Sequence, residues 1–157
     1  MSINMNPTTI LSDEQKDMLF FIYEGEKVAR DVYITLGEVH KDEDTFALMQ
    51  FSEQRHMNCT RDLCDTYGVE ISQVNEENVG KFESLVLQTL YDACTEKGEK
   101  SLHDALEVGE YIENVEIEDL EQATVGMPSD VVNVYENIKK RNLRHMDTFQ
   151  AALARAA

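Results

Sequence analysis

Residues 46–67 read FALMQFSEQRHMNCTRDLCDTY, a stretch without glycine or proline that we expect to form a helix. Residues spaced three or four apart share one face of a helix. Along that face the stretch is apolar at both ends and polar in the middle, with Phe46, Met49, Glu53, His56, Thr60, Leu63 and Tyr67. Because an unpaired buried carboxylate costs several kcal/mol to desolvate, Glu53 and His56 need partners in the core.

Four more segments of the 157-residue chain show helical periodicity, and no β-like alternation persists anywhere. The first of them opens with a capping box, in which Ser12 and Gln15 each satisfy a backbone N–H. The five predicted helices span about 12–39, 42–68, 81–97, 101–125 and 128–157. The sequence therefore predicts an all-α bundle of four long helices with one additional short helix.

The chain divides into a short arm and one domain. Residues 1–11 contain asparagine, proline and paired threonines, and we predict a flexible N-terminal arm there. Residues 12–157 contain no repeat and no linker, and they are numerous enough to bury a sizeable core. We expect them to form a single helical bundle domain.

The composition limits the class of partner. Lys and Arg total 14 against 31 Asp and Glu, which gives a formal charge of −17. Such a surface repels phosphate, so nucleic acid and anionic membranes are poor partners. No stretch approaches the roughly 18 apolar residues of a membrane span, and the first residues lack the order of a signal peptide. The three cysteines form no CxxC pair, which argues against a disulfide framework and a rubredoxin-type site. We expect a cytoplasmic protein.

The other long segments also carry polar residues in the middle of their apolar faces. Asn142 and His145 repeat the spacing of Glu53 and His56. Four faces interrupted at comparable depth suggest that these groups meet at a metal centre. Carboxylate and imidazole donors suit iron or manganese, and four carboxylates would balance two divalent ions. The predicted metal ligands are Glu26, Glu53, His56, Glu110, Glu113 and His145.

Four short motifs resemble the rubrerythrin-like proteins of the ferritin-like superfamily. Residues 26–33 (EKVARDVY) look like the first-helix E-x-x-A-R-x-x-Y motif, and residues 53–56 (EQRH) match the second-helix ExxH. Residues 109–113 (GEYIE) resemble the third-helix G-E-x-x-E, and residues 142–145 (NLRH) stand where the fourth helix carries its second ExxH. The wider pattern is similar to an uncharacterised ferritin-like branch, and the likeness spans roughly residues 12–153.

This resemblance implies a ferritin-like bundle with two iron ions, manganese being the alternative, that reduces peroxide or oxygen. Because the rubredoxin-type cysteine module is missing, the resemblance implies that a separate electron-donor protein supplies the electrons. Asn142 replaces the fourth-helix glutamate, and we expect it to hydrogen-bond a ligand rather than bind metal. Tyr33 lies on the apolar face of the first predicted helix, and Tyr135 lies on that of the last one. Their hydroxyls could orient a ligand there; the alternative is that both are ordinary core tyrosines.

Two other functions stay open at this point, and so does the question whether the protein is an enzyme. One is non-catalytic binding or sequestering of iron or another divalent metal, and the other is a metal-free helical interaction domain. A homodimer is compatible with the sequence, because helix-pair dimerisation is common in such bundles. We interpret Glu24, Asp31 and the remaining glutamates between 107 and 121 as exposed to solvent.

Overall fold

The computed structural model describes residues 9–156, which form five α-helices and contain no strand. The four long helices are α1 (Asp13–Val39), α2 (Thr45–Thr66), α4 (Leu102–Ala123) and α5 (Ser129–Ala156). The short helix α3 (Leu85–Gly98) packs against α1 and α4. The predicted all-α bundle with one additional short helix is confirmed.

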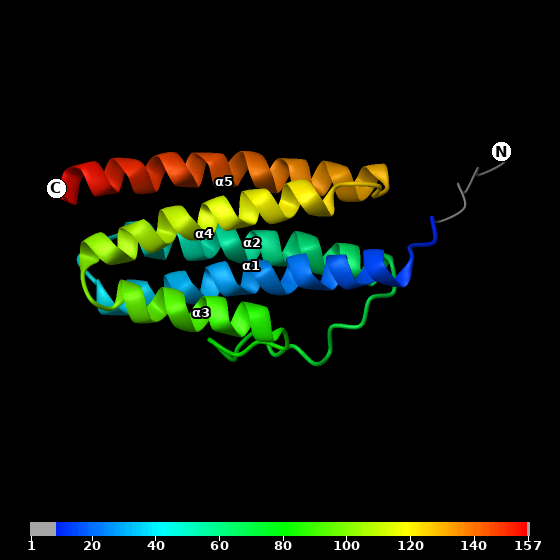
Figure 1. Cartoon of the computed structure of the whole chain (residues 1–157), viewed down its shortest axis with the longest axis horizontal. Helices are drawn as coiled ribbons and strands as arrows, with labels where there is room; N and C mark the ends of the chain where they lie inside the picture. Colours follow the sequence, from blue (N-terminus) through cyan, green and yellow to red (C-terminus); the bar gives the residue numbers. More distant parts are fainter. Residues whose placement is uncertain (1–8, 157) are drawn as a thin grey trace.

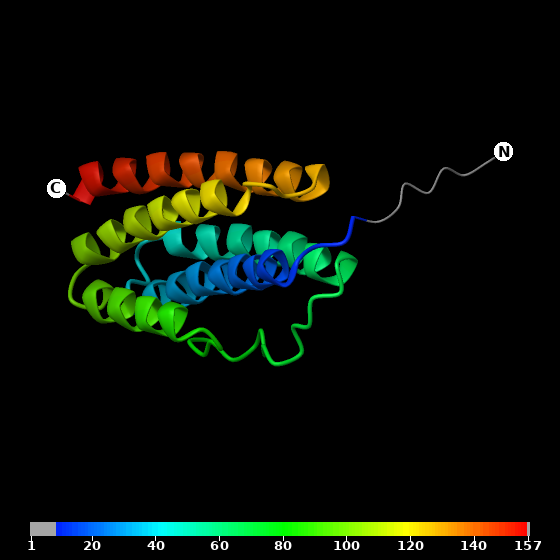
Figure 2. The same ribbon diagram turned by 45° about the vertical axis from the view of Figure 1, so that its right-hand side comes forward.

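Each long helix runs antiparallel to the two long helices that it contacts. α1 contacts α2 and α4, and α5 contacts α4 and α2, so that α2 and α4 lie on a diagonal (Figures 1 and 2). Because α2 and α4 run in the same direction, the chain has to return along the whole bundle between them. Residues 67–84 and α3 make that return, which explains why a fifth helix lies beside the bundle.

A buried carboxylate on α1 sets the start of α3, four residues later than the periodicity indicates. Glu24, which we interpreted as exposed, is fully buried. Its two oxygens accept hydrogen bonds from the backbone N–H groups of Glu83 and Ser84, at 2.6 and 2.8 Å. The Ser84 hydroxyl in turn accepts from the N–H of Leu87, so the helix begins directly after Ser84.

A second buried carboxylate on α1 holds the same return segment. Asp31, also interpreted as exposed, is fully buried and pairs with Lys27 at 2.7 Å and with Arg30 at 2.9 Å. Asp31 also accepts a hydrogen bond from the N–H of Gly80 at 3.0 Å. The cost of burying this charge is offset by two cations and a backbone donor.

Two hydrophobic clusters fill the two ends of the bundle. The cluster around Phe46 includes Val32, Tyr33, Leu36, Phe46, Leu106 and Phe149. The cluster around Leu120 includes Leu11, Leu19, Ile22, Met57, Leu120 and Val131. Leu11 therefore packs on the domain, whereas residues 1–8 lie outside the described residues and the predicted arm stays a prediction there.

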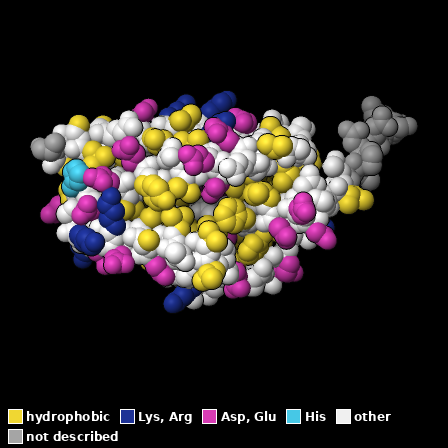
Figure 3. All heavy atoms as spheres, in the orientation of Figure 1, with side chains coloured by type: hydrophobic (Ala, Val, Ile, Leu, Met, Phe, Trp, Pro, Cys, Tyr) yellow, Lys and Arg dark blue, Asp and Glu magenta, His cyan; other side chains and the backbone are white. Residues whose placement is uncertain are grey.

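Among residues 9–156, no helix is long and apolar enough to cross a membrane. Figure 3 shows hydrophobic side chains gathered over α3 and α4, with acidic side chains around them. Leu85, Val86 and Tyr111 are among the exposed apolar side chains of these two helices. The homodimer that is compatible with the sequence stays untested by these contacts.

Gly109 lets α4 pack directly against α5. A Cβ at Gly109 would lie 2.3 Å from a ring carbon of Phe149, which is fully buried. Gly109→Ala is therefore expected to lower the free energy of unfolding by about 2 kcal/mol, as overpacked cores do. Gly25→Ala is the matched control, because a Cβ there meets nothing within 4 Å. The control should raise stability by about 0.5–1 kcal/mol through helix propensity. Urea denaturation of both variants tests this, and a Gly109→Ala protein with wild-type stability would contradict the close packing.

Candidate metal centre

Polar side chains from all four long helices meet between the two hydrophobic clusters. Glu26, Glu53, His56 and Glu113 are each no more than 3% exposed, and His145 is partly buried. α1 contributes Glu26, α2 contributes Glu53 and His56, α4 contributes Glu113, and α5 contributes His145. The structure thus brings together five of the six predicted ligands.

Glu53 belongs to two groups of candidate ligands. The first ligand group is Glu26, Glu53 and His56, and the second is Glu53, Glu113 and His145. In the first group, Nδ1 of His56 lies 3.0 Å from Oε2 of Glu53 and 3.4 Å from Oε2 of Glu26. In the second, Nδ1 of His145 lies 3.1 Å from Oε1 of Glu113 and 3.4 Å from Oε1 of Glu53. Glu53 therefore presents one carboxylate oxygen to each group.

The two histidines turn the same ring nitrogen toward the carboxylates. Since Nδ1 of both rings faces the ligand groups, Nε2 is left for other partners. Nε2 of His145 lies 3.1 Å from the Ser52 hydroxyl, which fixes the orientation of that ring. Nε2 of His56 is buried and has no hydrogen-bond partner among the described residues.

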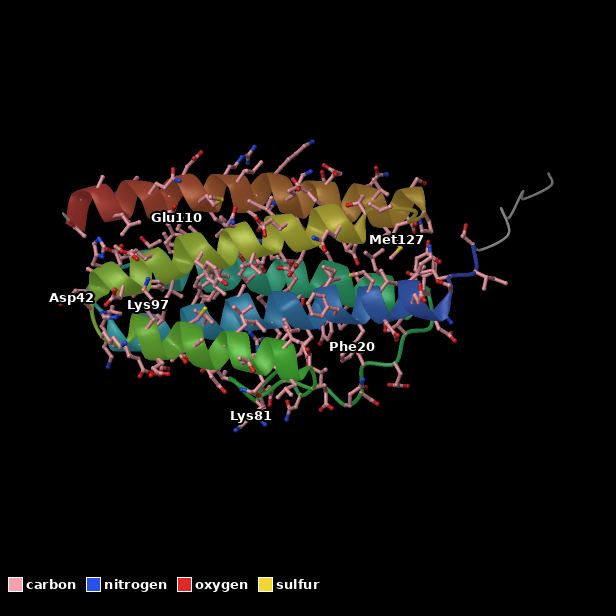
Figure 4. All side chains as sticks on the ribbon, in the orientation of Figure 1. Phe20, Asp42, Lys81, Lys97, Glu110 and Met127 are labelled. Carbon is pink, nitrogen blue, oxygen red and sulfur yellow. The ribbon has the colours of Figure 1, made fainter. Side chains whose placement is uncertain are left out.

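The structure does not bring Glu110 into this cluster. Glu110 lies at the border of α4 and α5 (Figure 4), in a surface groove that it shares with Tyr111, Asn114 and Met146. The neighbouring residue Gly109 takes the inward position at this turn of α4, where it meets Phe149. Glu110 is consequently one helical position away from the inward face.

Glu116, and not Glu110, is the second buried glutamate of α4. We interpreted Glu116 as exposed, and it is only 7% exposed. Burial, followed by the charges of Glu26, Glu53 and Glu113, raises the pKa of Glu116 well above its usual range. The carboxylate pair of α4 is therefore Glu113 and Glu116, one turn further along the helix than Glu110 and Glu113.

Asn142 occupies a fully buried position on α5. Neither atom of its side-chain amide has a hydrogen-bond partner within residues 9–156, so the hydrogen bond that we expected from it to a ligand is not formed. Buried amides without partners are rare in folded proteins, and they call for an explanation such as a bound ion or water.

The unpartnered oxygens of the cluster fit a pair of divalent cations. Glu26 Oε2, Glu53 Oε1, Glu113 Oε2 and both oxygens of Glu116 are buried without a hydrogen-bond partner in the described part of the chain. Leaving such a group unsatisfied costs about 1–3 kcal/mol, more when it is charged. Four carboxylates also supply the charge that two divalent ions would balance. The donor set consists of oxygen and imidazole nitrogen, as iron and manganese prefer.

Protons stabilise the centre when no metal is bound. Burial raises the pKa of Glu26 to about 7 and that of Glu113 to about 8. Burial also tends to raise the pKa of Glu53. The charge of His56 and the hydrogen bonds from His56 and His145 outweigh burial and hold this pKa well below its usual range. Burial lowers the pKa values of the histidines, yet the carboxylates raise them to about 11 for His56 and about 9 for His145. Metal binding would have to displace these protons.

Tyr33 supports a carboxylate of the second ligand group. Its hydroxyl donates a hydrogen bond of 2.9 Å to Oε1 of Glu113 and is buried, whereas the hydroxyl of Tyr135 has no partner among the described residues. Tyr33→Phe is expected to weaken metal binding about 10- to 100-fold, the usual effect of removing an outer hydrogen bond to a ligand. Competition with a chelator measures this, with the exposed Tyr111→Phe as control. Equal affinities in both variants would contradict the supporting role.

The chain is similar to a described protein family, to a sequence relative and to a solved structure. Residues 15–156 match a family model described as "Uncharacterized protein domain (DUF2202)". "Uncharacterized protein MJ0754" of Methanocaldococcus jannaschii is 37% identical over 148 residues, which cover 94% of this chain and 79% of the relative. The crystal structure of hypothetical protein MJ0754 from Methanococcus jannaschii DSM 2661 is similar with a TM-score of 0.90 and 36% identity, and the match covers 96% of this chain and 85% of that one.

Proposed function

We propose that this chain, which belongs to the DUF2202 family, binds two metal ions in its central cluster. It would then be a dinuclear metal protein of the ferritin-like, rubrerythrin-related kind. We propose iron as the metal, with manganese as the alternative. The reaction proposed is reduction of peroxide or oxygen with electrons from an external donor. The observation that carries the proposal is the position of Glu53, which is shared by two adjacent ligand groups.

The candidate ligands can be assigned to two ions. Glu26 and His56 would hold one ion, Glu113 and His145 would hold the other, and Glu53 would bridge them. Glu116 is the fourth buried carboxyl group, and once deprotonated it would supply the negative charge that Asn142 does not. With Glu116 included, the charges of four carboxylates and two divalent ions cancel in a buried site.

When bound, a pair of redox-active ions would supply the electron-transfer steps by which peroxide or oxygen is reduced. The chain itself positions the ligands. Tyr33 orients Glu113 through its hydroxyl, and Ser52 orients the ring of His145. The hydrophobic clusters at both ends of the bundle separate the centre from bulk water along the helix axes.

Steady-state consumption of hydrogen peroxide by the iron-loaded protein with an artificial electron donor tests the proposed reaction. We expect turnover in the wild-type protein and in Glu110→Gln, because Glu110 lies in the surface groove. Turnover in Glu53→Ala should fall to the rate of free iron. Wild-type turnover no faster than that of Glu53→Ala would contradict an oxidoreductase. Two tightly bound ions without turnover would favour the sequestering function.

A further inference from the structure

A pocket of about 530 Å³ opens between α2 and α5, beside the proposed metal centre. Arg55 of α2 and Lys140, Arg141 and Arg144 of α5 line it, and His56 forms part of its wall. The three cations on α5 are spaced one, three and four residues apart, which places them around one face of that helix. Arg55 faces them from α2, so the pocket has cations on both sides.

The charge of this pocket is opposite to that of the whole chain. The chain carries 14 Lys and Arg against 31 Asp and Glu, yet among residues 9–156 no carboxylate lines the pocket. None of its four cations pairs with a carboxylate in the described part of the chain, whereas Lys27, Arg30 and Arg61 do form ion pairs. Lys and Arg side chains are also visible along the α5 edge of the molecule in Figure 3. Unpaired cations gathered in a concave site concentrate anions there.

His56 gives the pocket a buried hydrogen-bonding group. Its side chain is only 3% exposed, and its Nδ1 is turned toward Glu26 and Glu53. Nε2, on the other side of the ring, has no partner among the described residues, and the ring lines the pocket. Nε2 is therefore a buried polar atom without a partner in the wall of a cationic pocket, and in its N–H form it can donate a hydrogen bond.

We propose that this pocket binds a small anion that carries phosphate or carboxylate groups, with one anionic oxygen accepting a hydrogen bond from Nε2 of His56. Guanidinium groups bind both kinds of anion through paired N–H donors, and Arg55, Arg141 and Arg144 provide three such groups. A small ligand fits better than a macromolecule, because the volume is typical of small-molecule sites and the His56 ring that lines the pocket is buried. This anion site goes beyond the proposed function, since its residues and charge are present with or without metal.

The test titrates inorganic phosphate and, separately, succinate into the full chain, both metal-free and loaded with diamagnetic zinc. Calorimetry measures binding, and nitrogen-15 NMR of the histidine side chains reports on Nε2 of His56. Arg141→Gln/Arg144→Gln is expected to weaken binding about tenfold or more. Lys100→Gln/Arg155→Gln is the matched control, since it removes two exposed cations outside the pocket. The control should change binding by less than about twofold.

Saturable binding that shifts the His56 resonance and is lost in the pocket variant supports the proposal, and the tighter of the two probes identifies the anionic group. No saturable binding up to about 20 mM, or equal losses in both double variants, would overturn it. An unmoved His56 resonance would also overturn it. An acidic peptide is titrated in the same way as a third probe. Far tighter binding of this peptide through the same arginines would also overturn the proposal, because the occupant would then be a protein. Measurement in the metal-free chain keeps this result separate from any failure of the metal centre.

Discussion

Replacing Glu53 by alanine is expected to abolish binding of both metal ions. Glu53 is the one residue common to the two ligand groups, and its two oxygens face different histidines. Its removal leaves each group with one carboxylate and one histidine, which is too few donors to hold a divalent ion tightly. Elemental analysis after anaerobic loading with ferrous iron should fall from about two ions per chain to none.

Matched variants make this result specific. Glu26→Ala removes a ligand from the first group only, and Glu113→Ala removes one from the second only, so each should lower the content to about one ion per chain. Glu116→Gln keeps the shape of the buried side chain but removes its charge, and it should weaken binding. Glu110→Gln removes an equal charge from the surface groove and should leave the metal content unchanged. Wild-type metal content in Glu53→Ala would contradict the shared position.

The second large effect is a fall in the stability of the metal-free protein as the pH rises from about 5 to about 9. Folding raises the pKa of Glu26 to about 7 and of Glu113 to about 8, from an ordinary value of 4.5. It raises the pKa of His56 to about 11 and of His145 to about 9, from 6.5. In this window the folded state binds more protons than the unfolded state, so rising pH favours unfolding. We expect a loss of at least about 2 kcal/mol in the free energy of unfolding.

Urea denaturation at several pH values measures this slope. Glu26→Gln/Glu113→Gln should flatten it, because two of the three carboxyls of the cluster with raised pKa values no longer titrate. Bound metal should reverse it, since divalent ions bind the deprotonated ligands and are displaced by protons at low pH. A metal-free protein whose stability rises steadily from pH 5 to pH 9 would contradict the buried, mutually repelling carboxylates.

The fold and most of the cluster could be predicted from the sequence because local signals agreed with one another. The capping box at Ser12 and Gln15 is present as predicted. The three-residue spacing on α2 carried Glu53 and His56 to the same face, and that face is buried. His145 was predicted from the same three-residue spacing on α5, although the residue three positions before it is Asn142 and not a glutamate.

The inward face of α4 could not be fixed by periodicity alone. A stripe through Leu106, Glu110 and Glu113 has the same three- and four-residue spacing as a stripe through Leu106, Gly109 and Glu113. The two stripes differ only in whether Gly109 or Glu110 is the inward residue. Glycine has no side chain, so its position on the core face cannot be recognised from hydrophobicity. The packing of Phe149 against Gly109 selects the second stripe, and this contact is long-range. The same selection brings Glu116 inward, as its spacing from Glu113 could have suggested.

Two buried carboxylates of α1 were also missed. Glu24 bonds to backbone N–H groups about sixty residues away, and Asp31 is neutralised partly by residues of its own helix. Neither carboxylate lies on an apolar stripe, so each resembled a solvated residue. The cationic pocket could not be predicted for a different reason. The net charge of −17 is a sum over the whole chain, and it does not show that Arg55, Arg141 and Arg144 line the same pocket.

Anomalous X-ray scattering from crystals of the iron-loaded protein tests the central claim most directly. Two peaks should lie on opposite sides of the Glu53 carboxylate, one in the first ligand group and one in the second. The structure also has a partly exposed group of His103, Asp104 and Glu107 near the start of α4, which serves as an internal comparison. Iron found only at the group of His103, Asp104 and Glu107, or a single ion that does not contact Glu53, would contradict a dinuclear centre in the core of the bundle.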